Sequence, residues 1–145
     1  MTRAGRGRDP AAQGAADAER VAQYCPDLAT WPRSWSVEPR DIAPGQQLVE
    51  RFTPFLLHLL AAGLSRKTLR LHRDNLWALG GEMIRTFYDD PPSRHRGVEA
   101  WLAKAIGEDG GPLLSHRTSE PHQRAFDSTC RRFYRFLRTA SPQTH

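Results

Sequence analysis

The sequence predicts an all-α protein in which four helices follow a disordered N-terminal tail. Three observations support this prediction. Apolar residues recur at helical spacing in four segments, and no segment of useful length shows the alternation of apolar and polar residues that is typical of a strand. Serine and glycine stand where helices should begin and end. The length of 145 residues indicates one domain.

The N-terminal third of the chain contains no apolar helical period. Residues 1–20 are rich in glycine, alanine, arginine and aspartate, and we expect them to be disordered. Residues 21–42 contain three prolines and two tryptophans. This segment is expected to be either an extended arm, laid on the domain through Trp31 and Trp35, or a loosely tethered linker. The helical domain would then span residues 43–140.

The first predicted helix covers residues 43–62, where apolar side chains keep the helical period. Pro54 falls inside this pattern and should kink the helix, because proline removes a backbone hydrogen bond. Gly63 is a natural C-terminal stop. Only a short connection then separates this helix from the next one.

The second predicted helix begins after Ser65, a good N-cap, and extends to about residue 87. Gly80 and Gly81 each lower helix propensity by about 1 kcal/mol relative to alanine. We therefore expect another helix to approach closely at these two glycines.

The third and fourth predicted helices cover residues 98–106 and about 120–138, the latter with Ser119 as N-cap. Three residues of the last helix share one face, and we expect this face to pack against the apolar face of the second helix. The two sets are Phe126, Phe133 and Leu137 on the last helix, and Leu69, Leu76 and Met83 on the second.

The net charge of +5 is concentrated in two segments that are far apart in sequence. Residues 64–81 carry four cations and one anion, and residues 121–145 carry five arginines and one anion. Residues 1–63 are neutral in sum, and residues 82–120 have two more anions than cations. If the two basic segments face the same way, they form one positive surface, which is the usual footprint of a protein that binds a polyanion.

Several classes of protein are disfavoured by the sequence. No apolar run approaches the roughly 20 residues that cross a bilayer, and the N-terminus lacks the apolar region of a secretory signal. Cys25 and Cys130 are too few for a disulfide framework, so we expect a cytoplasmic protein without a membrane partner. His116 and His122 fall well short of the four ligands that a structural zinc site uses. With no catalytic motif present, we expect no enzyme activity, no metal and no cofactor.

Three stretches resemble the core-binding, SAM-like N-terminal domain of tyrosine recombinases and phage integrases. They are "FTPFLLHLLAAGLSRKTLRLHRDNL", "VEAWLAKAIGEDG" and "CRRFYRFL". The resemblance covers about 90 residues, from Leu48 to Leu137. It implies a four-helix SAM-like orthogonal bundle that clamps one face of duplex DNA, mainly through the helix after "GLS" and the final helix. Those two helices are the ones in which the positive charge is concentrated.

The sequence also departs from the pattern of this family. The catalytic domain should follow the bundle, but only seven residues remain after Arg138. Tyr134 belongs to the bundle helix, so we expect that this chain cannot cleave DNA. His72 stands where the family often has an aromatic residue, and Asp127 places an anion among the arginines of the last helix. The chain is interpreted as a free-standing domain or a truncated product.

The expected partner is therefore duplex DNA, bound mainly through its phosphate backbone. A catalytic recombinase or a second copy of the chain is a further expected partner. The predicted DNA-binding residues are Ser65, Arg66, Lys67, Thr68, Arg70, Arg73, Arg124, Arg131, Arg132 and Arg135. A helix start with Ser65, Lys67 and Thr68 can hold a phosphate, but plain helix capping explains the serine equally well. Arginine stripes can contact DNA, or can simply be a solvated face.

Two other interpretations stay open. In the first, the bundle is a protein-interaction module whose charges only keep it soluble, and one of its tryptophans anchors the partner. The candidates are Trp31, Trp35, Trp77 and Trp101, and an exposed Trp77 in an apolar patch would favour this interpretation. In the second, "LLAAGLSRKTLRLH" is a helix-turn-helix, although the second helix is long for that motif.

Overall fold

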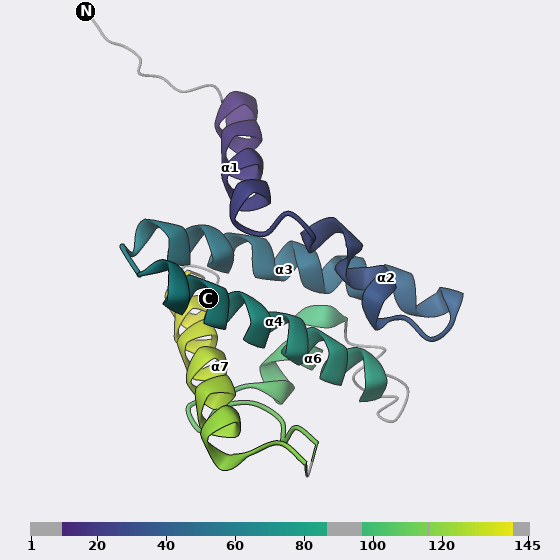
Figure 1. Ribbon diagram of the computed structural model, residues 1–145. Coiled ribbons are helices and arrows are strands. Elements are labelled where there is room, and N and C mark those ends of the chain that lie inside the picture. The colour runs from purple at the N-terminus through teal and green to yellow at the C-terminus, as the bar shows by residue number, and fades with distance from the viewer. Residues whose placement is uncertain (1–9, 87–96, 116, 141–145) are drawn as a thin grey trace, which may run out of the picture.

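The computed structural model describes residues 10–86, 97–115 and 117–140, and within them the chain is mostly helical (Figure 1). The helices are α1 (Pro10–Tyr24), α2 (Trp31–Trp35), α3 (Ile42–Ala61), α4 (Arg66–Thr86), α6 (Val98–Ala105) and α7 (Glu120–Ala140). Two short 3-10 helices, η1 (Leu28–Thr30) and η2 (Pro39–Asp41), lie between α1 and α3. The all-α prediction is confirmed, since the described residues contain only an isolated β-bridge between Gly107 and Gly110.

The four predicted helices correspond to α3, α4, α6 and α7, and their ends follow the expected capping chemistry. Ser65 Oγ accepts a hydrogen bond from the Thr68 N–H at 3.2 Å, and Ser119 Oγ accepts one from the His122 N–H at 3.2 Å. Gly63, just after the end of α3, has a φ of +74°, which favours glycine. Residue 87, the expected end of the second helix, lies outside the described residues.

Pro54 lies inside α3 without ending it. Its side chain is exposed, so the ring causes no clash with the core. The hydroxyl of the preceding Thr53 donates a hydrogen bond to the Val49 carbonyl at 2.7 Å, which adds a side-chain bond in this turn. The helix therefore continues through the proline, as the apolar period indicates.

The prediction of a disordered tail over residues 1–20 is wrong for residues 10–20, which form most of α1. This helix contains six alanines, and alanine has the highest intrinsic helix propensity. Pro10 occupies the first turn, where its missing N–H costs nothing. Val21 is the only residue of α1 that is buried, which explains why no apolar period was visible. Residues 1–9 lie outside the described residues.

The segment 21–42 is neither an extended arm nor a loose linker. It contains the end of α1, two 3-10 turns and α2, and it packs on α3 and α4. The indole rings of Trp31 and Trp35 are both buried, so these two residues do attach the segment to the domain, as one of the two alternatives had it, although the segment is helical and not extended. Asp41 orders the turn before α3, because its carboxylate accepts hydrogen bonds from the Val37 and Glu38 N–H groups at 2.8 and 3.1 Å.

Helix α2 makes a tight contact with α4 at Gly80. A Cβ atom at this position would overlap the six-membered ring of Trp35, whose Nε1 donates a hydrogen bond to the Trp77 carbonyl at 3.0 Å. The expectation of a close approach by another helix is therefore confirmed at Gly80, whereas a Cβ at Gly81 would find its nearest neighbour at 3.4 Å. The approaching group is a single tryptophan side chain from the short helix α2.

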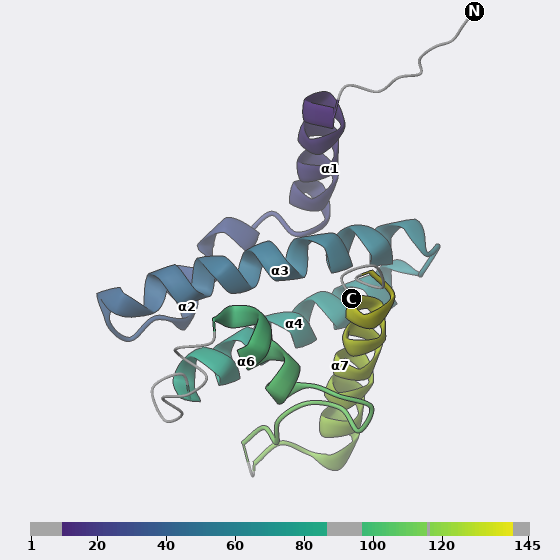
Figure 2. The ribbon, with the colours of Figure 1, turned by 180° about the vertical axis from the view of Figure 1, so that it is seen from behind.

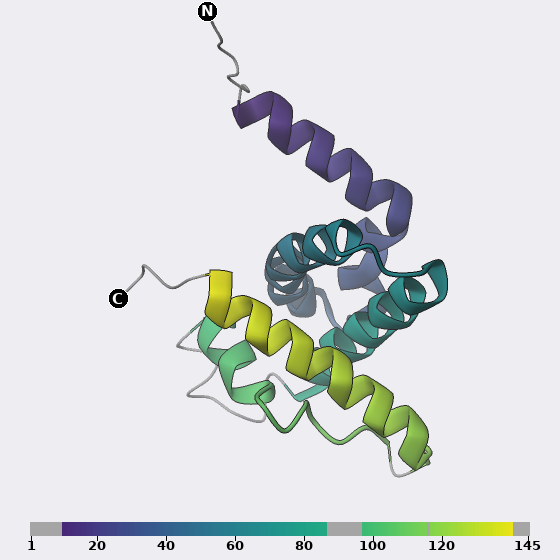
Figure 3. The same ribbon diagram turned by 90° about the vertical axis from the view of Figure 1, so that its left-hand side faces the viewer.

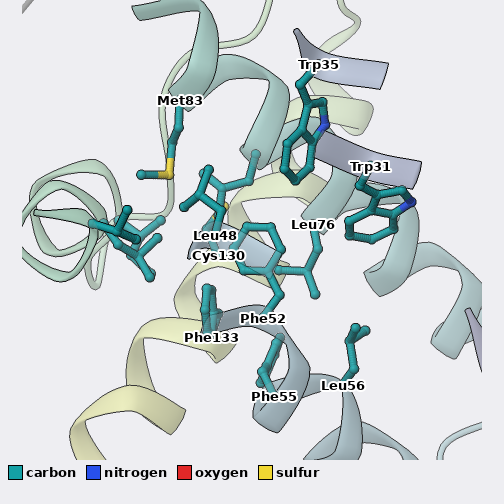
Figure 4. Close-up of a cluster of buried hydrophobic side chains, with 14 of the residues drawn as sticks. Trp31, Trp35, Leu48, Phe52, Phe55, Leu56, Leu76, Met83, Cys130 and Phe133 are labelled. Atoms are coloured by element: carbon teal, nitrogen blue, oxygen red, sulfur yellow. The ribbon is translucent and has the colours of Figure 1, made fainter. Parts of the chain in front are cut away.

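The core is centred on Phe133 of α7 and the aromatic residues of α3 (Figure 4). The Phe133 ring lies 4.8 Å from the Phe55 ring and 5.5 Å from the Phe52 ring, measured between centroids. Leu76 and Met83 belong to the same buried cluster. Phe126 is fully buried in it, while Leu69 and Leu137 are partly buried against it, so the two predicted faces do belong to the core. The ring contacts of Phe133 are made with α3 and not with α4, and Leu137 lines a hollow with Pro54 of α3, so the expected packing of these two residues on α4 is not what the structure shows.

A polar seam lies between α4 and α7 within this otherwise apolar core. His72 Nδ1 is 2.7 Å from the Thr129 hydroxyl, and Asn75 Nδ2 donates hydrogen bonds to that hydroxyl at 2.9 Å and to the Ala125 carbonyl at 3.2 Å. All three side chains are buried. Their mutual hydrogen bonds satisfy groups that would otherwise be costly to bury.

The helices form two unequal parts. Helices α2, α3, α4, α6 and α7 pack together, with α3 lying across α4 and α7 (Figures 1 and 2). Helix α1 stands away from this body, and only its C-terminal end approaches it (Figure 3). Tyr24, the last residue of α1, donates a hydrogen bond from its hydroxyl to the Leu69 carbonyl at 2.6 Å, which fastens α1 to α4.

Candidate nucleic-acid interface

The first turns of α4 hold the densest group of cations without acidic partners. Arg66, Lys67 and Arg70 are exposed, and no carboxylate in the described part of the chain pairs with any of them. The first turn of α4 also has no acidic residue. Cations at a helix N-terminus are unfavourable because the helix dipole is positive there. This end of α4 is therefore a surface that an anion would stabilise.

Ser65 and Thr68 are occupied with each other. The Ser65 hydroxyl accepts the Thr68 N–H and donates to the Thr68 hydroxyl at 3.0 Å. The capping interpretation of Ser65 is thus confirmed, whereas a phosphate contact stays a prediction.

Arg66, Arg70 and Arg73 line one hollow between α1 and α4, with a volume of about 380 Å³. Gln23 and Tyr24 of α1 form the opposite wall, and Leu60 and Leu69 contribute apolar surface. Sequence reasoning missed Gln23 and Tyr24 because it placed them in an arm or linker over residues 21–42 and did not predict α1. The alanine content of residues 10–24 was the signal that could have revealed that helix.

Arg73 differs from its two neighbours because it is held by carboxylates. Its guanidinium lies 3.3 Å from Asp27 Oδ1 and 3.4 Å from Asp74 Oδ1. Burial raises the pKa of Asp27, but a hydrogen bond from Trp31 and the Arg73 charge outweigh it and hold that pKa below its usual range. Arg73 therefore fastens the turn after α1 to α4, and less of its charge is available to a ligand.

Three of the four predicted arginines on α7 also have partners. The Arg131 Nε donates to the Glu108 carbonyl at 2.7 Å, and the Arg135 guanidinium binds the Glu108 carboxylate at 2.9 Å. The hydrogen bond from Arg135 lowers the pKa of Glu108. Arg124 lies 3.6 Å from Glu120. Arg131 and Arg135 thus hold the loop after α6 against α7.

Arg132 is the exception among these four arginines, because it has no carboxylate partner within the described residues and its charge lies near His72 of α4. Burial of His72 lowers the pKa of that imidazole, and the nearby charge of Arg132 lowers it further. Arg132 also lines a hollow of about 290 Å³ with His58, Phe136 and Thr139. It is the α7 cation that the fold brings toward α4.

The two predicted arginine stripes do not form one uniform surface. Helix α4 meets α7 through His72 and Asn75. Arg70 lies about 140° around the helix from Asn75, at about 100° per residue, and lines the hollow beside α1 instead. Lys67 lies between the side of α4 that faces α7 and the side that carries Arg70. The structure therefore brings Arg132 close to α4 but separates it from Arg66 and Arg70 by the exposed side of that helix.

Asp127 does not lie among the outward-facing arginines, contrary to the expectation from sequence. Its carboxylate accepts hydrogen bonds from the Gly111 N–H at 3.2 Å and the Gln123 side chain at 3.0 Å. It therefore orders the loop that precedes α7. His58 is exposed, with its ring 4.9 Å from that of Phe136.

Three of the four candidate tryptophan anchors are core residues. Trp31, Trp35 and Trp101 are buried, and only Trp77 is exposed, at 44%. Its Nε1 donates to the Ser34 hydroxyl at 2.9 Å. The residues around its hollow include Asp27, Arg73 and Asp74, so its setting is polar and not an apolar patch.

No group of three metal-ligating side chains occurs within residues 10–86, 97–115 and 117–140, and His116 lies outside them. Both cysteines are buried, and burial raises the pKa of Cys25 and of Cys130 to about 12. These thiols therefore stay protonated and poorly nucleophilic at neutral pH. No helix in the same residues is long and apolar enough to cross a membrane.

A comparison with known protein families, curated proteins and solved structures finds no match to this chain.

Proposed function

We propose that this chain is a non-catalytic domain that binds duplex DNA through the phosphate backbone, as its resemblance to the core-binding domain of tyrosine recombinases suggests. The observation that carries the proposal is the start of α4, where Arg66, Lys67 and Arg70 have no acidic partner in the described part of the chain. Arg132, on the α4 side of α7, adds a fourth cation of this kind. Helices α3, α4, α6 and α7 would then be the SAM-like bundle.

The lack of catalysis is part of the same proposal. The Tyr24 hydroxyl is bonded to the Leu69 carbonyl, and burial raises the pKa of Tyr24, so this phenol is a poor nucleophile. Tyr134 lies half-buried in α7, where Arg138 donates a hydrogen bond to its hydroxyl at 3.3 Å. Tyr88 lies outside the described residues. A catalytic recombinase or a second copy of the chain, in the cytoplasm, would be its partner on DNA.

The test is fluorescence anisotropy on a 20-base-pair duplex of random sequence over a series of salt concentrations. If four cations each neutralise one phosphate, log K against log salt should have a slope of about −3 to −4. Arg132→Gln should weaken binding several-fold and flatten the slope by about 1. Arg131→Gln is the matched control on the next residue. It should change affinity less, because that guanidinium already bonds Glu108.

Equal losses in the two variants would show that the assignment of Arg132 is wrong. A wild-type chain that does not bind the duplex at about 20 mM salt would remove the DNA proposal altogether, because backbone contacts are strongest at low salt.

A second candidate function, a protein-interaction module, is favoured by an apolar hollow of about 510 Å³ between α3, α6 and α7. Its apolar lining includes Pro54, Ile106 and Leu137, and an ion pair of 3.2 Å joins Arg51 and Glu99 at its rim. If DNA binding is absent, sedimentation of the wild type and of Ala103→Arg will test whether a second copy of the chain uses this hollow.

A further inference from the structure

We propose that the hollow between α1 and α4 binds one phosphate group of the nucleic-acid backbone, with Arg66 and Arg70 as its ligands and Gln23 as the opposite wall. This inference deepens the proposed DNA-binding function and rests on it for the identity of the ligand. It also assigns a role to α1, a helix that lies outside the recombinase-like region of the sequence.

The two arginines form an unbalanced pair of charges. Arg66 and Arg70 are four residues apart on α4, so they share one face, and like charges at this spacing repel each other. Neither has a carboxylate partner in the described part of the chain, and the helix dipole adds to the positive potential. An anion between them would offset both the repulsion between the two guanidinium groups and their unfavourable interaction with the helix dipole.

The nearby acidic groups do not compete for this position. Asp27 and Asp74 both lie against the guanidinium of Arg73, which is the innermost cation of the hollow. Arg73 therefore neutralises the local carboxylates and leaves Arg66 and Arg70 free.

Helix α1 makes this surface concave. The hydrogen bond from Tyr24 to the Leu69 carbonyl holds the end of α1 over α4, and Gln23 then faces the arginines across the hollow. Burial raises the pKa of Tyr24, so its phenol stays neutral and does not repel an anion. The amide of Gln23 can donate a hydrogen bond to the same ligand.

Phosphate is the anion that this chemistry fits best. A guanidinium binds phosphate oxygens in a bidentate manner, and two guanidiniums can hold two edges of one phosphate group. The apolar residues Leu60 and Leu69 offer no donors, so the ligand must be recognised through the arginines and Gln23. The hollow opens at the start of α4, where the proposed DNA contact lies, and one bound backbone could therefore reach both.

The first arm of the test follows the arginine Nε–Hε resonances by NMR during titration with inorganic phosphate and with the dinucleotide TpT. We expect saturable shifts for Arg66 and Arg70, and little change for Arg85, which is paired with Glu82 at the far end of α4. Shifts of Arg66 and Arg70 no larger than that of Arg85 would overturn the proposal. A response to a glutamate-rich peptide but not to phosphate would overturn it equally.

The second arm uses Gln23→Glu, which places a carboxylate in the hollow to compete with phosphate. Affinity for a 20-base-pair duplex should fall about fivefold to tenfold, with a salt slope flatter by about 1. Ala22→Glu is the matched control, because it adds the same charge at the same level of α1 on an exposed residue that does not line the hollow. It should change affinity less than twofold. Equal effects of the two variants would exclude a site in the hollow.

The two arms separate the two proposals. If the chain binds phosphate and TpT at Arg66 and Arg70 but does not bind the duplex, the hollow is a phosphate site and the proposed DNA-binding function is wrong. If the chain binds the duplex and Gln23→Glu does not change the affinity, the DNA-binding function is supported and the phosphate site in the hollow is wrong.

Discussion

At the scale of single residues, Gly80 and Gly81 show how two identical neighbours can have opposite roles. Both lie inside α4 and lower its helix propensity. A Cβ at Gly80 would overlap the Trp35 ring, whereas a Cβ at Gly81 would lie 3.4 Å from the nearest atom of that ring, at ordinary contact distance. Gly80 is therefore required by packing, while Gly81 is tolerated at a cost in propensity.

Gly80→Ala should lower the free energy of unfolding by about 1–3 kcal/mol, because the new methyl group forces the indole to move. Gly81→Ala should leave stability unchanged or raise it by up to about 1 kcal/mol, since alanine favours the helix and has room. Urea denaturation of both variants measures the difference. Two variants of equal stability would show that Trp35 does not press on α4 at Gly80.

At the scale of elements, the pairing of α4 with α7 depends on a polar seam that should be sensitive to pH. His72 is buried between them, and burial together with the Arg132 charge lowers its pKa in the folded state. The unfolded chain therefore binds a proton at His72 more readily than the folded chain. Stability should be independent of this group above about pH 6.5 and should fall as the pH decreases below that value.

Urea denaturation between pH 5 and pH 8 will show this dependence, with a slope of at most about 1.4 kcal/mol per pH unit for one group. His72→Gln keeps a polar side chain next to Thr129 but cannot titrate, so its stability should change less over the same range. The carboxyl groups with lowered pKa, Asp27 and Glu108, lose their contribution only at more acidic pH. If His72→Gln shows the same slope of unfolding free energy against pH as the wild type, the pH dependence comes from another group.

The elements also show what the sequence can reveal. The start of α4 and both ends of α3, α6 and α7 were predictable to within two residues because apolar periods, Ser65, Gly63 and Ser119 mark them locally. Helix α1 could not be predicted in this way, because alanine stabilises a helix without producing an apolar stripe. The segment with Trp31 and Trp35 was missed as a structured element because its prolines suggested an extended chain, whereas one of them starts α2.

At the scale of the whole molecule, charge was the least predictable property of the candidate interface. The charge count by segment gave residues 82–120 an excess of negative charge and residues 121–145 an excess of positive charge. It treated the two segments as if their charges did not meet. In the fold, Glu108 from the first segment lies on Arg131 and Arg135 of the second. Such pairing is tertiary and has no local signature, so the candidate site is smaller than the sequence indicated and is centred on α4.

This pairing leads to a prediction that depends on the proposed function. Glu108→Gln removes the carboxylate that binds Arg135, so DNA affinity should rise several-fold and the salt slope should steepen by about 1. Glu99→Gln is the control, because it also removes a carboxylate paired with an arginine, but on the α3–α6 side. Anisotropy titrations would contradict the prediction if both variants gain affinity equally, since net charge alone would then explain the effect.

The contact between Trp35 and Gly80 also has a consequence for the evolution of this chain. No side chain can be added at position 80 while the indole at position 35 stays in place, since the two occupy the same volume. Sequences that descend from this one and keep its fold should therefore change these positions together, with a larger residue at 80 accompanied by a smaller one at 35. Correlated substitution at these two positions would show that the packing of α2 on α4 is maintained among such sequences.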